Sequence, residues 1–281
     1  MLLQQRGMAS AEALRWPRYE LIPIDGVLKQ VPYLPANATV TVTCSAARGI
    51  EPTIELVEHL TRLGYRSTPH LAARSIESDD HLDEIVGRLT GAGVSDVYVI
   101  GGDSEEPAGP FPDAESLLQA IAGRGNPFTD IGIAGYPEGH PLIETGRLWN
   151  SMKAKQHYAT YLVTQMCFDA SVIVDWVTEA RQHDISLPIW VGLPGVASTA
   201  QIVRIAGKIG VGQSMRFLRK NLGLVSRFFR PGLYEPDELI EALDERFRTP
   251  TLDLRGFHVY TFNSVDSTER WRRRRLPDES D

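Results

Sequence analysis

Apolar, β-branched runs recur along the chain, separated by segments whose apolar residues follow a helical spacing. The runs are nearly continuous in apolar residues, as expected of parallel strands that are buried on both faces. Residues 53–64 have apolar positions at roughly helical intervals and a glycine placed to end the helix, and 79–89 and 113–122 behave alike. We expect eight strands, at residues 19–24, 39–44, 67–72, 96–102, 130–136, 161–168, 188–193 and 257–262.

Eight strands that alternate with helices predict an α/β fold of the closed (β/α)₈ type, the TIM barrel. The alternative is an open, doubly wound sheet. However, no G-x-G-x-x-G follows the first strand and no G-x-x-x-x-G-K-[ST] occurs anywhere, so the barrel is favoured.

The interval from about 196 to 255 is longer than the others. It predicts extra helices before the last strand, at 221–232 and from 236 onward. No linker or low-complexity tract divides the chain. We therefore expect a single domain: a short N-terminal extension (1–18), a barrel (19–275) and a C-terminal tail (276–281).

Charge and composition exclude several classes of protein. A net charge of -7 argues against a general nucleic-acid binder. No apolar run approaches the roughly 20 residues that cross a bilayer, and the first residues lack a secretory signal. Two cysteines, Cys44 and Cys167, are too few for a disulfide framework and lack partners at metal-ligand spacing. We expect two buried, reduced thiols, a cytoplasmic protein, no resident metal and no membrane partner.

An arginine-rich run, at residues 270–275, stands near the C-terminus. Such a run can contact phosphate or anionic lipid. We interpret it instead as the solvated face of a last helix.

Polar residues occur in or just after the apolar runs, where stability alone would not place them. The active sites of TIM barrels are built at the C-terminal ends of the strands. The candidates are Glu20, Thr43, His70, Asp103, Tyr136, Glu138, His140 and Gln165.

Glu20 is flanked by bulky apolar residues. A buried carboxylate loses hydration, so its pKa rises and it can hold a proton near neutral pH. A general acid needs this property. The alternative is a carboxylate that is neutralised by a nearby arginine such as Arg18 or Arg48.

Asp103 follows the pair Gly101 and Gly102, which lets a ligand approach the backbone closely. An ionised carboxylate there could accept two parallel N–H bonds from an amidine-like edge, such as a 2-aminopyrimidinone ring. The alternative is a turn or helix-capping aspartate.

Gln165 lies within an apolar strand, so its amide needs partners. It could read a donor and an acceptor on a heterocycle, or it could be a satisfied core glutamine. His70 and His140 each stand beside a proline, which leaves a structural or a catalytic role open. Their spacing indicates no metal cluster.

Taken in order, seven segments resemble the catalytic domain of the methylenetetrahydrofolate reductase family. The resemblance spans about residues 19 to 264. Single segments are weak evidence, but seven in the right order and spacing are specific. They are Y-E-L-I-P-I, V-T-V-T-C-S-A, P-H-L-A-A, V-I-G-G-D, I-A-G-Y-P-E-G-H-P, T-Q-M-C-F-D and G-F-H-V-Y-T-F-N.

The resemblance implies a TIM barrel that reduces 5,10-methylenetetrahydrofolate to 5-methyltetrahydrofolate. Glu20 matches the family's proton donor, Asp103 the acid that binds the pterin edge, and Gln165 a glutamine that contacts folate and nicotinamide. It implies NADH or NADPH as hydride donor, with NADH favoured, and leaves a homo-oligomer open. The matched positions that would contact cofactor are Thr43, His70, Gly102, Tyr136, His140 and Gln165.

The sequence departs from the family where FAD would bind. Gly101 replaces the family's arginine, Tyr158 stands where glycine is expected, and a basic pair is reduced to Lys153 beside Ala154. The aromatic residue that stacks on nicotinamide aligns with Thr199. A diphosphate needs charge-assisted contacts and close backbone approach, and both are weakened. We therefore expect a divergent member in which FAD is absent or weakly held and NAD(P)H delivers hydride directly.

Other functions stay open at this point. The chain could be a folate-binding protein of the same fold with little catalysis, although binding alone does not require Glu20. It could also be an FAD-dependent reductase of the same reaction, or a flavin barrel enzyme that acts on another heterocycle.

Overall fold

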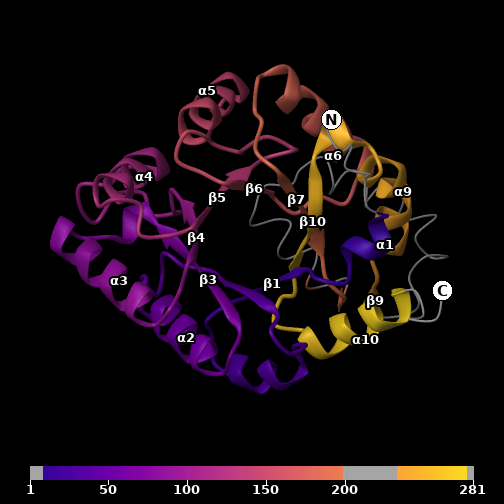
Figure 1. The fold of residues 1–281 in the computed structure, drawn as a ribbon, viewed down its shortest axis with the longest axis horizontal. Coiled ribbons are helices and arrows are strands. Elements are labelled where there is room, and N and C mark those ends of the chain that lie inside the picture. Colours follow the sequence, from indigo (N-terminus) through magenta and orange to yellow (C-terminus); the bar gives the residue numbers. More distant parts are fainter. Residues whose placement is uncertain (1–8, 199–200, 202–232, 277–281) are drawn as a thin grey trace, which may run out of the picture.

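Eight parallel strands form a closed barrel, in the order β1-β10-β7-β6-β5-β4-β3-β2. The computed structural model describes residues 9–198, 201 and 233–276. Figure 1 shows the strands at the centre of a ring of helices. The TIM barrel predicted from the sequence is confirmed. The strands are β1 (Arg18–Leu21), β2 (Thr39–Val42), β3 (Arg66–Ala72), β4 (Asp96–Ile100), β5 (Asp130–Gly135), β6 (Tyr161–Thr164), β7 (Ile189–Pro194) and β10 (Leu254–Tyr260).

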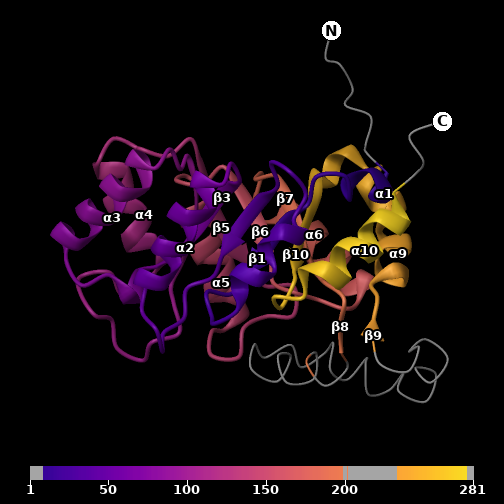
Figure 2. The same ribbon diagram turned by 90° about the horizontal axis from the view of Figure 1, so that it is seen from below.

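The helices lie outside the strands, with α2 to α4 on one side of the molecule and α9 and α10 on the other (Figure 2). Their bounds are α1 (Ser10–Ala13), α2 (Glu51–Arg62), α3 (Asp79–Gly91), α4 (Ala114–Gly123), α5 (Thr145–Lys155), α6 (Ala170–Gln182), α9 (Asp237–Phe247) and α10 (Val265–Arg275). Short 3₁₀ turns are η1 (Val27–Lys29), η2 (Val31–Tyr33), η3 (Ala73–Ser75) and η4 (Pro250–Leu252).

The helix boundaries follow local chemistry. Ser78 caps α3 by accepting a hydrogen bond from the backbone N–H of His81, and Asp113 with Ser116 forms a capping box at α4. Gly64 follows the end of α2 with φ of 90°, in the left-handed region that glycine favours. The predicted helices at 53–64, 79–89 and 113–122 are therefore confirmed within two residues at each end.

The core lies between the strands and the helices, because alternate strand residues face opposite sides. On β1, Tyr19 faces outward and donates its hydroxyl hydrogen bond to Glu269 of α10. Arg18 faces the barrel interior, where it donates to Tyr161 of β6. Residue 20 shares the inward face with residue 18. This alternation places Glu20 inside the barrel.

The segment before the last strand was predicted to hold extra helices. The helix from 236 onward is confirmed as α9, whereas 221–232 lies outside the described residues. A short antiparallel pair, β8 (Ala197–Ser198) with β9 (Leu233–Tyr234), was not expected. Its strands are two residues long, which is too short for a pattern of alternating residues to reveal.

The arginine-rich run forms the last turns of α10, as expected, and the predicted solvated face is confirmed for most of its arginines but is wrong for Arg272. Arg270 and Arg273 are exposed, whereas Arg272 is buried with 7% exposure. The Arg272 Nε atom lies 2.6 Å from Glu269 Oε1, and its Nη1 donates to the Leu14 carbonyl. Helical periodicity turns residues 269 and 272 towards the barrel, so that this arginine ties the helix to the N-terminal segment.

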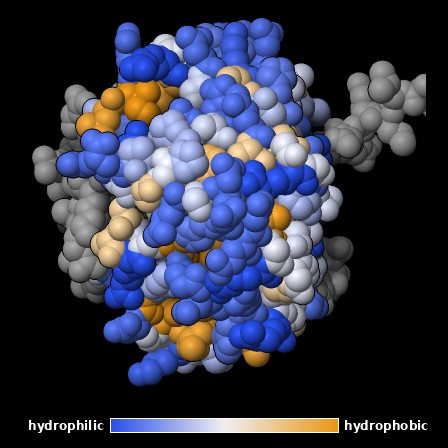
Figure 3. Space-filling view, turned by 90° about the vertical axis from the view of Figure 1, so that its left-hand side faces the viewer, coloured by the Kyte–Doolittle hydropathy of each residue, from blue (hydrophilic) through white to orange (hydrophobic). Residues whose placement is uncertain are grey.

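Both cysteines follow strands instead of lying within them. Cys44 comes two residues after β2 and Cys167 three residues after β6, and neither forms a disulfide. Across the described part of the chain, no helix is both long enough and apolar enough to cross a membrane. The side of the molecule that carries α3 and α4 is covered mainly by hydrophilic residues (Figure 3).

Candidate functional site

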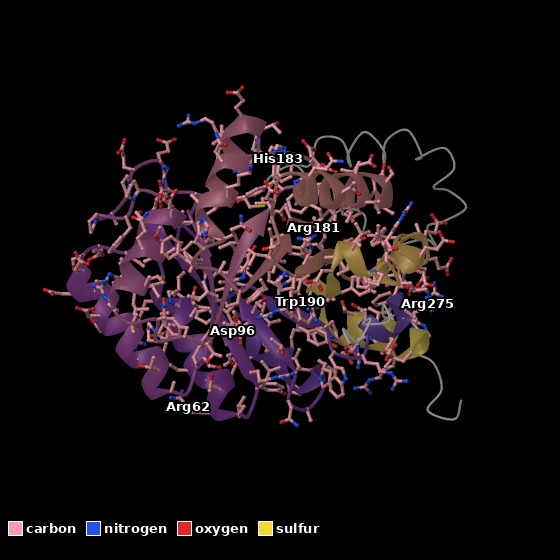
Figure 4. All side chains as sticks on the ribbon, turned by 45° about the horizontal axis from the view of Figure 1, so that its top comes forward. Arg62, Asp96, Arg181, His183, Trp190 and Arg275 are labelled. Atoms are coloured by element: carbon pink, nitrogen blue, oxygen red, sulfur yellow. The ribbon has the colours of Figure 1, made fainter. Side chains whose placement is uncertain are left out.

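The barrel interior contains a lower layer of polar side chains whose charges are paired with one another, although the buried Arg18 Nε atom has no hydrogen-bond partner among the described residues. The Arg18 guanidinium forms an ion pair with Asp96 of β4 and donates to the Tyr161 hydroxyl at 2.9 Å. It also lies over the rings of Tyr161 and Trp190, at 4.3 and 5.2 Å from their centroids. Figure 4 shows Asp96 and Trp190 within the ring of strands, whereas Arg62 and Arg275 mark the outer helices. We call Arg18, Asp96, Tyr161 and Trp190 the lower layer.

A second layer lies one inward position further along β1. Glu20 Oε2 is 3.1 Å from Nε2 of His258 on β10 and 3.9 Å from Nε2 of His70 on β3. The Glu20 side chain is 12% exposed, that of His258 1% and that of His70 7%. We call Glu20, His70 and His258 the upper layer. It brings together three groups that stand far apart in the sequence.

Burial sets the charges of the upper layer. Loss of hydration raises the pKa of Glu20 to about 7, and the nearby His70 opposes this only in part. Burial lowers the pKa of His70 to about 4 and that of His258 to about 3, and the positive charge of Arg18 adds to both shifts. Near neutral pH the two imidazoles are therefore neutral, and a large fraction of Glu20 holds a proton.

The alternative role of Glu20, as the partner of an arginine, is not what the described residues show. Arg18 pairs with Asp96, and the Arg48 side chain lies 3.8 Å from Asp25 and donates to the Pro23 carbonyl. Because no arginine neutralises Glu20 in this part of the chain, the general-acid interpretation is the better supported.

Two tyrosines stand against the upper layer. The Tyr98 ring centroid is 4.6 Å from that of His70, and the Tyr260 ring centroid is 4.9 Å from that of His258. Burial raises the pKa of both hydroxyls well above the usual value for tyrosine, and Glu20 adds to both shifts. Both tyrosines therefore remain neutral hydrogen-bond donors, and Tyr260 donates to the Thr164 carbonyl.

Three of these residues were not singled out from the sequence: His258, Tyr98 and Tyr260. Their signal was weak but present, because His258 and Tyr260 occupy alternate positions of one apolar run and therefore share a face. Polar residues at alternate positions of a predicted barrel strand point to the interior.

Asp103 lies on the rim, three residues beyond the end of β4, and is exposed. Burial raises the pKa of Tyr136, and the charge of Asp103 adds to this shift. Burial lowers the pKa of His140, and the charge of Asp103 opposes that shift. The rings of Tyr136 and His140 meet edge to face at 5.1 Å. Three predicted site residues therefore gather on the rim at the C-terminal ends of β4 and β5.

The rim and the upper layer are neighbours. Burial raises the pKa of Tyr98 and of Tyr136; Tyr136 and Glu20 add to the shift of Tyr98, and Asp103 adds to that of Tyr136. The two acids singled out from the sequence therefore lie towards the same end of the barrel, with Glu20 deep and Asp103 on the surface.

The two glycines before Asp103 differ. Gly102 has φ of 89°, and a Cβ atom added there would lie 3.2 Å from the Cβ of Ala72 on β3. Gly101 would meet nothing within 4 Å. Gly102 is therefore required by its own backbone conformation and by the close passage of β3. Asp103 is no helix cap, because Asp113 caps α4.

The prediction that Gln165 lies within a strand is wrong, because β6 ends at Thr164. Gln165 and Thr43 each lie just beyond the C-terminal end of a strand, and both are half-buried. The Gln165 Oε1 atom accepts a hydrogen bond from the Met166 backbone N–H at 2.8 Å, which orients its NH₂ group away from that contact. The Thr43 carbonyl accepts from the Thr53 hydroxyl at 2.8 Å and so ties β2 to α2. Their contacts with a ligand stay a prediction.

A cavity of about 180 Å³ lies between the end of β5 and the helices α5 and α6. The Trp149 ring stacks on Trp176, with ring centroids 5.6 Å apart. The cavity wall includes both tryptophans, Tyr136 and the carboxylates Glu138 and Glu179. The cavity adjoins the rim through Tyr136. Unlike the upper layer, it is lined by two carboxylates and no histidine.

The upper layer also has the donor set of a metal site with two histidines and one carboxylate, since one atom of each residue lies within 4.8 Å of the others. A ligating histidine usually donates its other ring N–H to a neighbour. Among the residues that the structure describes, His258 Nδ1 has no hydrogen-bond partner. The Arg18 charge below also disfavours a cation. The trio is better suited to handling a proton.

Comparisons with known proteins identify the family of the chain. A family model described as methylenetetrahydrofolate reductase matches residues 27–216. The chain is 28% identical over 158 residues to methylenetetrahydrofolate reductase 1 of Schizosaccharomyces pombe, covering 53% of this chain and 26% of that protein. It is 24% identical over 208 residues to methylenetetrahydrofolate reductase (NADH) 1 of Arabidopsis thaliana, covering 66% and 34%.

The chain thus spans about a quarter to a third of the length of these relatives. The family model nevertheless covers more than half of the chain, across β2 to β7 and the rim residues. The closed barrel and the family match lead to one conclusion: the chain belongs to the methylenetetrahydrofolate reductase family.

Proposed function

We propose that this protein reduces 5,10-methylenetetrahydrofolate to 5-methyltetrahydrofolate with hydride from NAD(P)H. One observation carries the proposal. Glu20 is a buried carboxyl group, without an arginine partner among the described residues, that contacts neutral histidines inside the C-terminal end of the barrel. Family membership suggests the reaction, and this carboxyl group supplies the acid that it needs.

The reaction needs a proton before it can use a hydride. The methylene carbon is held between two nitrogens, so one C–N bond must break. The Glu20 carboxyl O–H bond breaks and its proton goes to the departing nitrogen, which takes the C–N electron pair and leaves an iminium cation. Nicotinamide supplies a hydride to that carbon, so that NAD(P)H is oxidised and the methyl group forms. The Glu20 carboxylate then regains a proton from solvent.

Asp103 would hold the amino-pyrimidine edge of the pterin. It is exposed on the rim, within electrostatic reach of Tyr136 and His140, and can accept two N–H bonds at once. Gln165 would bind the pterin from β6 through its NH₂ group. A pterin between these residues would bring its five-membered ring towards Glu20.

Nicotinamide would lie over the same strand ends. Thr43, His70, Gly102, Tyr136 and His140 are the residues we assign to it, with Gln165 shared between the two ligands. His70 supports the assignment, because its Nε2 atom is buried without a hydrogen-bond partner among the described residues. NADH is the favoured donor, since the Arabidopsis relative is named as an NADH enzyme.

We propose further that no FAD is tightly held. The cavity beside α5 measures about 180 Å³, below the roughly 300–1,000 Å³ of pockets for drug-sized ligands. It also presents two carboxylates, Glu138 and Glu179, which repel a diphosphate. Tyr158, which replaces a glycine of the family, packs against the core. These residues do not fit FAD, so we assign it no step. Stoichiometric flavin absorbance in the purified protein would refute this part of the proposal.

Glu20→Gln tests the function. The variant keeps the shape of the side chain but has no transferable proton, so the reductase rate should fall by about 10²- to 10⁴-fold. Binding of methylenetetrahydrofolate, measured by equilibrium dialysis, should survive. Glu55→Gln, which changes an exposed carboxylate of α2, is the matched control. If rate and binding fall together, Glu20 is structural and the proposal fails.

A further inference from the structure

His258 is the residue of the upper layer that the sequence did not single out. Its Nε2 atom lies 3.1 Å from Glu20 Oε2, at hydrogen-bond distance, whereas His70 Nε2 lies at 3.9 Å, too far for a hydrogen bond. His258 is 1% exposed, and its ring centroid lies 6.4 Å from that of Tyr98 and 4.9 Å from that of Tyr260. Its position relative to Glu20 is therefore fixed by packing.

The unpartnered ring nitrogen of His258 indicates which tautomer is present. Nδ1 is buried without a partner in the described structure. An N–H group is rarely left orphaned in a protein interior, so the hydrogen is better placed on Nε2, where Glu20 accepts it. With Oε2 occupied by this bond, the acidic proton of Glu20 belongs on Oε1, the oxygen left for substrate.

We propose that His258 is a positioning residue that donates its Nε2–H to Glu20 Oε2, so that the proton on Oε1 is presented to the departing nitrogen of the substrate. The inference rests on the proposed function. It assigns His258 two effects: it fixes the orientation of the carboxyl group before proton transfer, and it stabilises the carboxylate afterwards.

The second effect follows from charge. A hydrogen bond to an ionised acceptor is roughly twice as strong as one between neutral groups. The bond from His258 therefore strengthens as Glu20 loses its proton, which favours the transfer. The groups that face Glu20 from the surrounding elements are His70 of β3, Tyr98 of β4, His258 and Tyr260 of β10, and Arg18 below it on β1.

His258→Phe and His258→Gln separate this role from packing. Phenylalanine fills the space but donates no hydrogen bond, whereas glutamine offers an amide N–H. With the phenylalanine variant we expect kcat to fall by about 10- to 100-fold, with KM changed by less than about threefold. The glutamine variant should recover most of the loss. His59→Phe, on α2, is the control for a histidine outside the barrel.

The titration of Glu20 gives an independent readout. Infrared difference spectra of the ligand-free protein follow the carboxyl C=O band with pH, and Glu20→Gln identifies that band. Loss of the donor should move the Glu20 titration, and the alkaline fall of kcat, to higher pH by about one unit. A purely structural role would lower kcat without moving either.

The inference is overturned if the titration of Glu20 is the same in wild type and His258→Phe, or if the glutamine variant is no better than the phenylalanine variant. Should the phenylalanine variant fail to fold, His258→Asn replaces it, because its shorter amide cannot reach Oε2. The titration needs no substrate. A wild-type protein that reduces no folate would therefore refute the function while the titration still reports on the pair.

Discussion

The two polar layers of the barrel interior stand two residues apart on the same strand, yet they differ in how their charges are satisfied. In the lower layer, Arg18 is paired with Asp96 and bonded to Tyr161, and Asp96 also accepts from the Tyr161 hydroxyl. In the upper layer, Glu20 contacts two neutral histidines. Among the described residues, His70 Nε2 and His258 Nδ1 lack hydrogen-bond partners there, and in the lower layer Arg18 Nε lacks one although its charge is paired.

This difference in charge pairing indicates a structural role for the lower layer and a functional role for the upper layer. A buried polar group without a partner costs about 1–3 kcal/mol. The Arg18 charge is compensated by Asp96, whereas no arginine compensates Glu20 among the described residues, and such exceptions are expected at functional sites. The lower layer pairs opposite charges inside the barrel. The upper layer instead has a carboxyl group and imidazole nitrogens that could bind a ligand. The two layers should therefore respond to substitution in opposite ways.

The largest effect is expected from breaking the lower layer. Asp96→Ala leaves the buried Arg18 charge unpaired, so the free energy of unfolding should fall by about 3–5 kcal/mol. Denaturant unfolding measures it. Asp79→Ala removes an acid from the exposed pair with Arg124 and should cost no more than about 1 kcal/mol. Equal losses in the two variants would mean that the lower layer is not a structural pair.

The upper layer should instead make stability depend on pH. Burial raises the pKa of Glu20 from 4.5 to about 7, so the folded protein binds this proton more tightly than the unfolded chain. The stability contributed by Glu20 is complete below pH 4.5 and is lost as pH rises through 7, by about 3 kcal/mol in all.

Comparison of wild type with Glu20→Gln isolates that loss. The variant cannot ionise at this position, so its free energy of unfolding relative to wild type should rise between pH 5 and pH 8. It should thus be more stable than wild type at alkaline pH while inactive as a reductase. A difference that is constant over this range would show that Glu20 keeps an ordinary pKa.

The smallest effect concerns the rim. Gly102→Ala forces a residue with a Cβ into the left-handed region, which should cost about 1–2 kcal/mol of stability. Gly101→Ala has open space and no positive φ, so it should be neutral or stabilising by less than about 1 kcal/mol. Thermal unfolding of both variants measures the contrast. Equal losses would mean that both positions serve a ligand or a neighbour.

The sequence predicts the fold better than the site. Eight buried strands leave eight apolar runs, so their number and order are visible without the structure. Glu20 and Asp103 could be singled out because each is a polar residue at the end of such a run. The partner of Glu20 could not be, since His258 comes from the last strand and only barrel closure, which pairs β1 with β10, brings the two together.

The burial of Arg272 could not be predicted either, because it depends on contacts between distant parts of the chain. Within a run of arginines, the chain itself does not mark which member faces the barrel. That choice depends on where α10 packs against Tyr19 and the N-terminal segment. Contacts between the two ends of the chain are thus the part that local patterns do not reveal.

The most direct test of the account is anaerobic mixing of the purified, flavin-free protein with 5,10-methylenetetrahydrofolate and NADH, with nicotinamide absorbance as the readout. We expect NADH to be oxidised by the wild-type protein without added flavin, and at least about 100-fold more slowly by Glu20→Gln. Oxidation that requires added flavin, or that proceeds equally in the variant, would contradict the account.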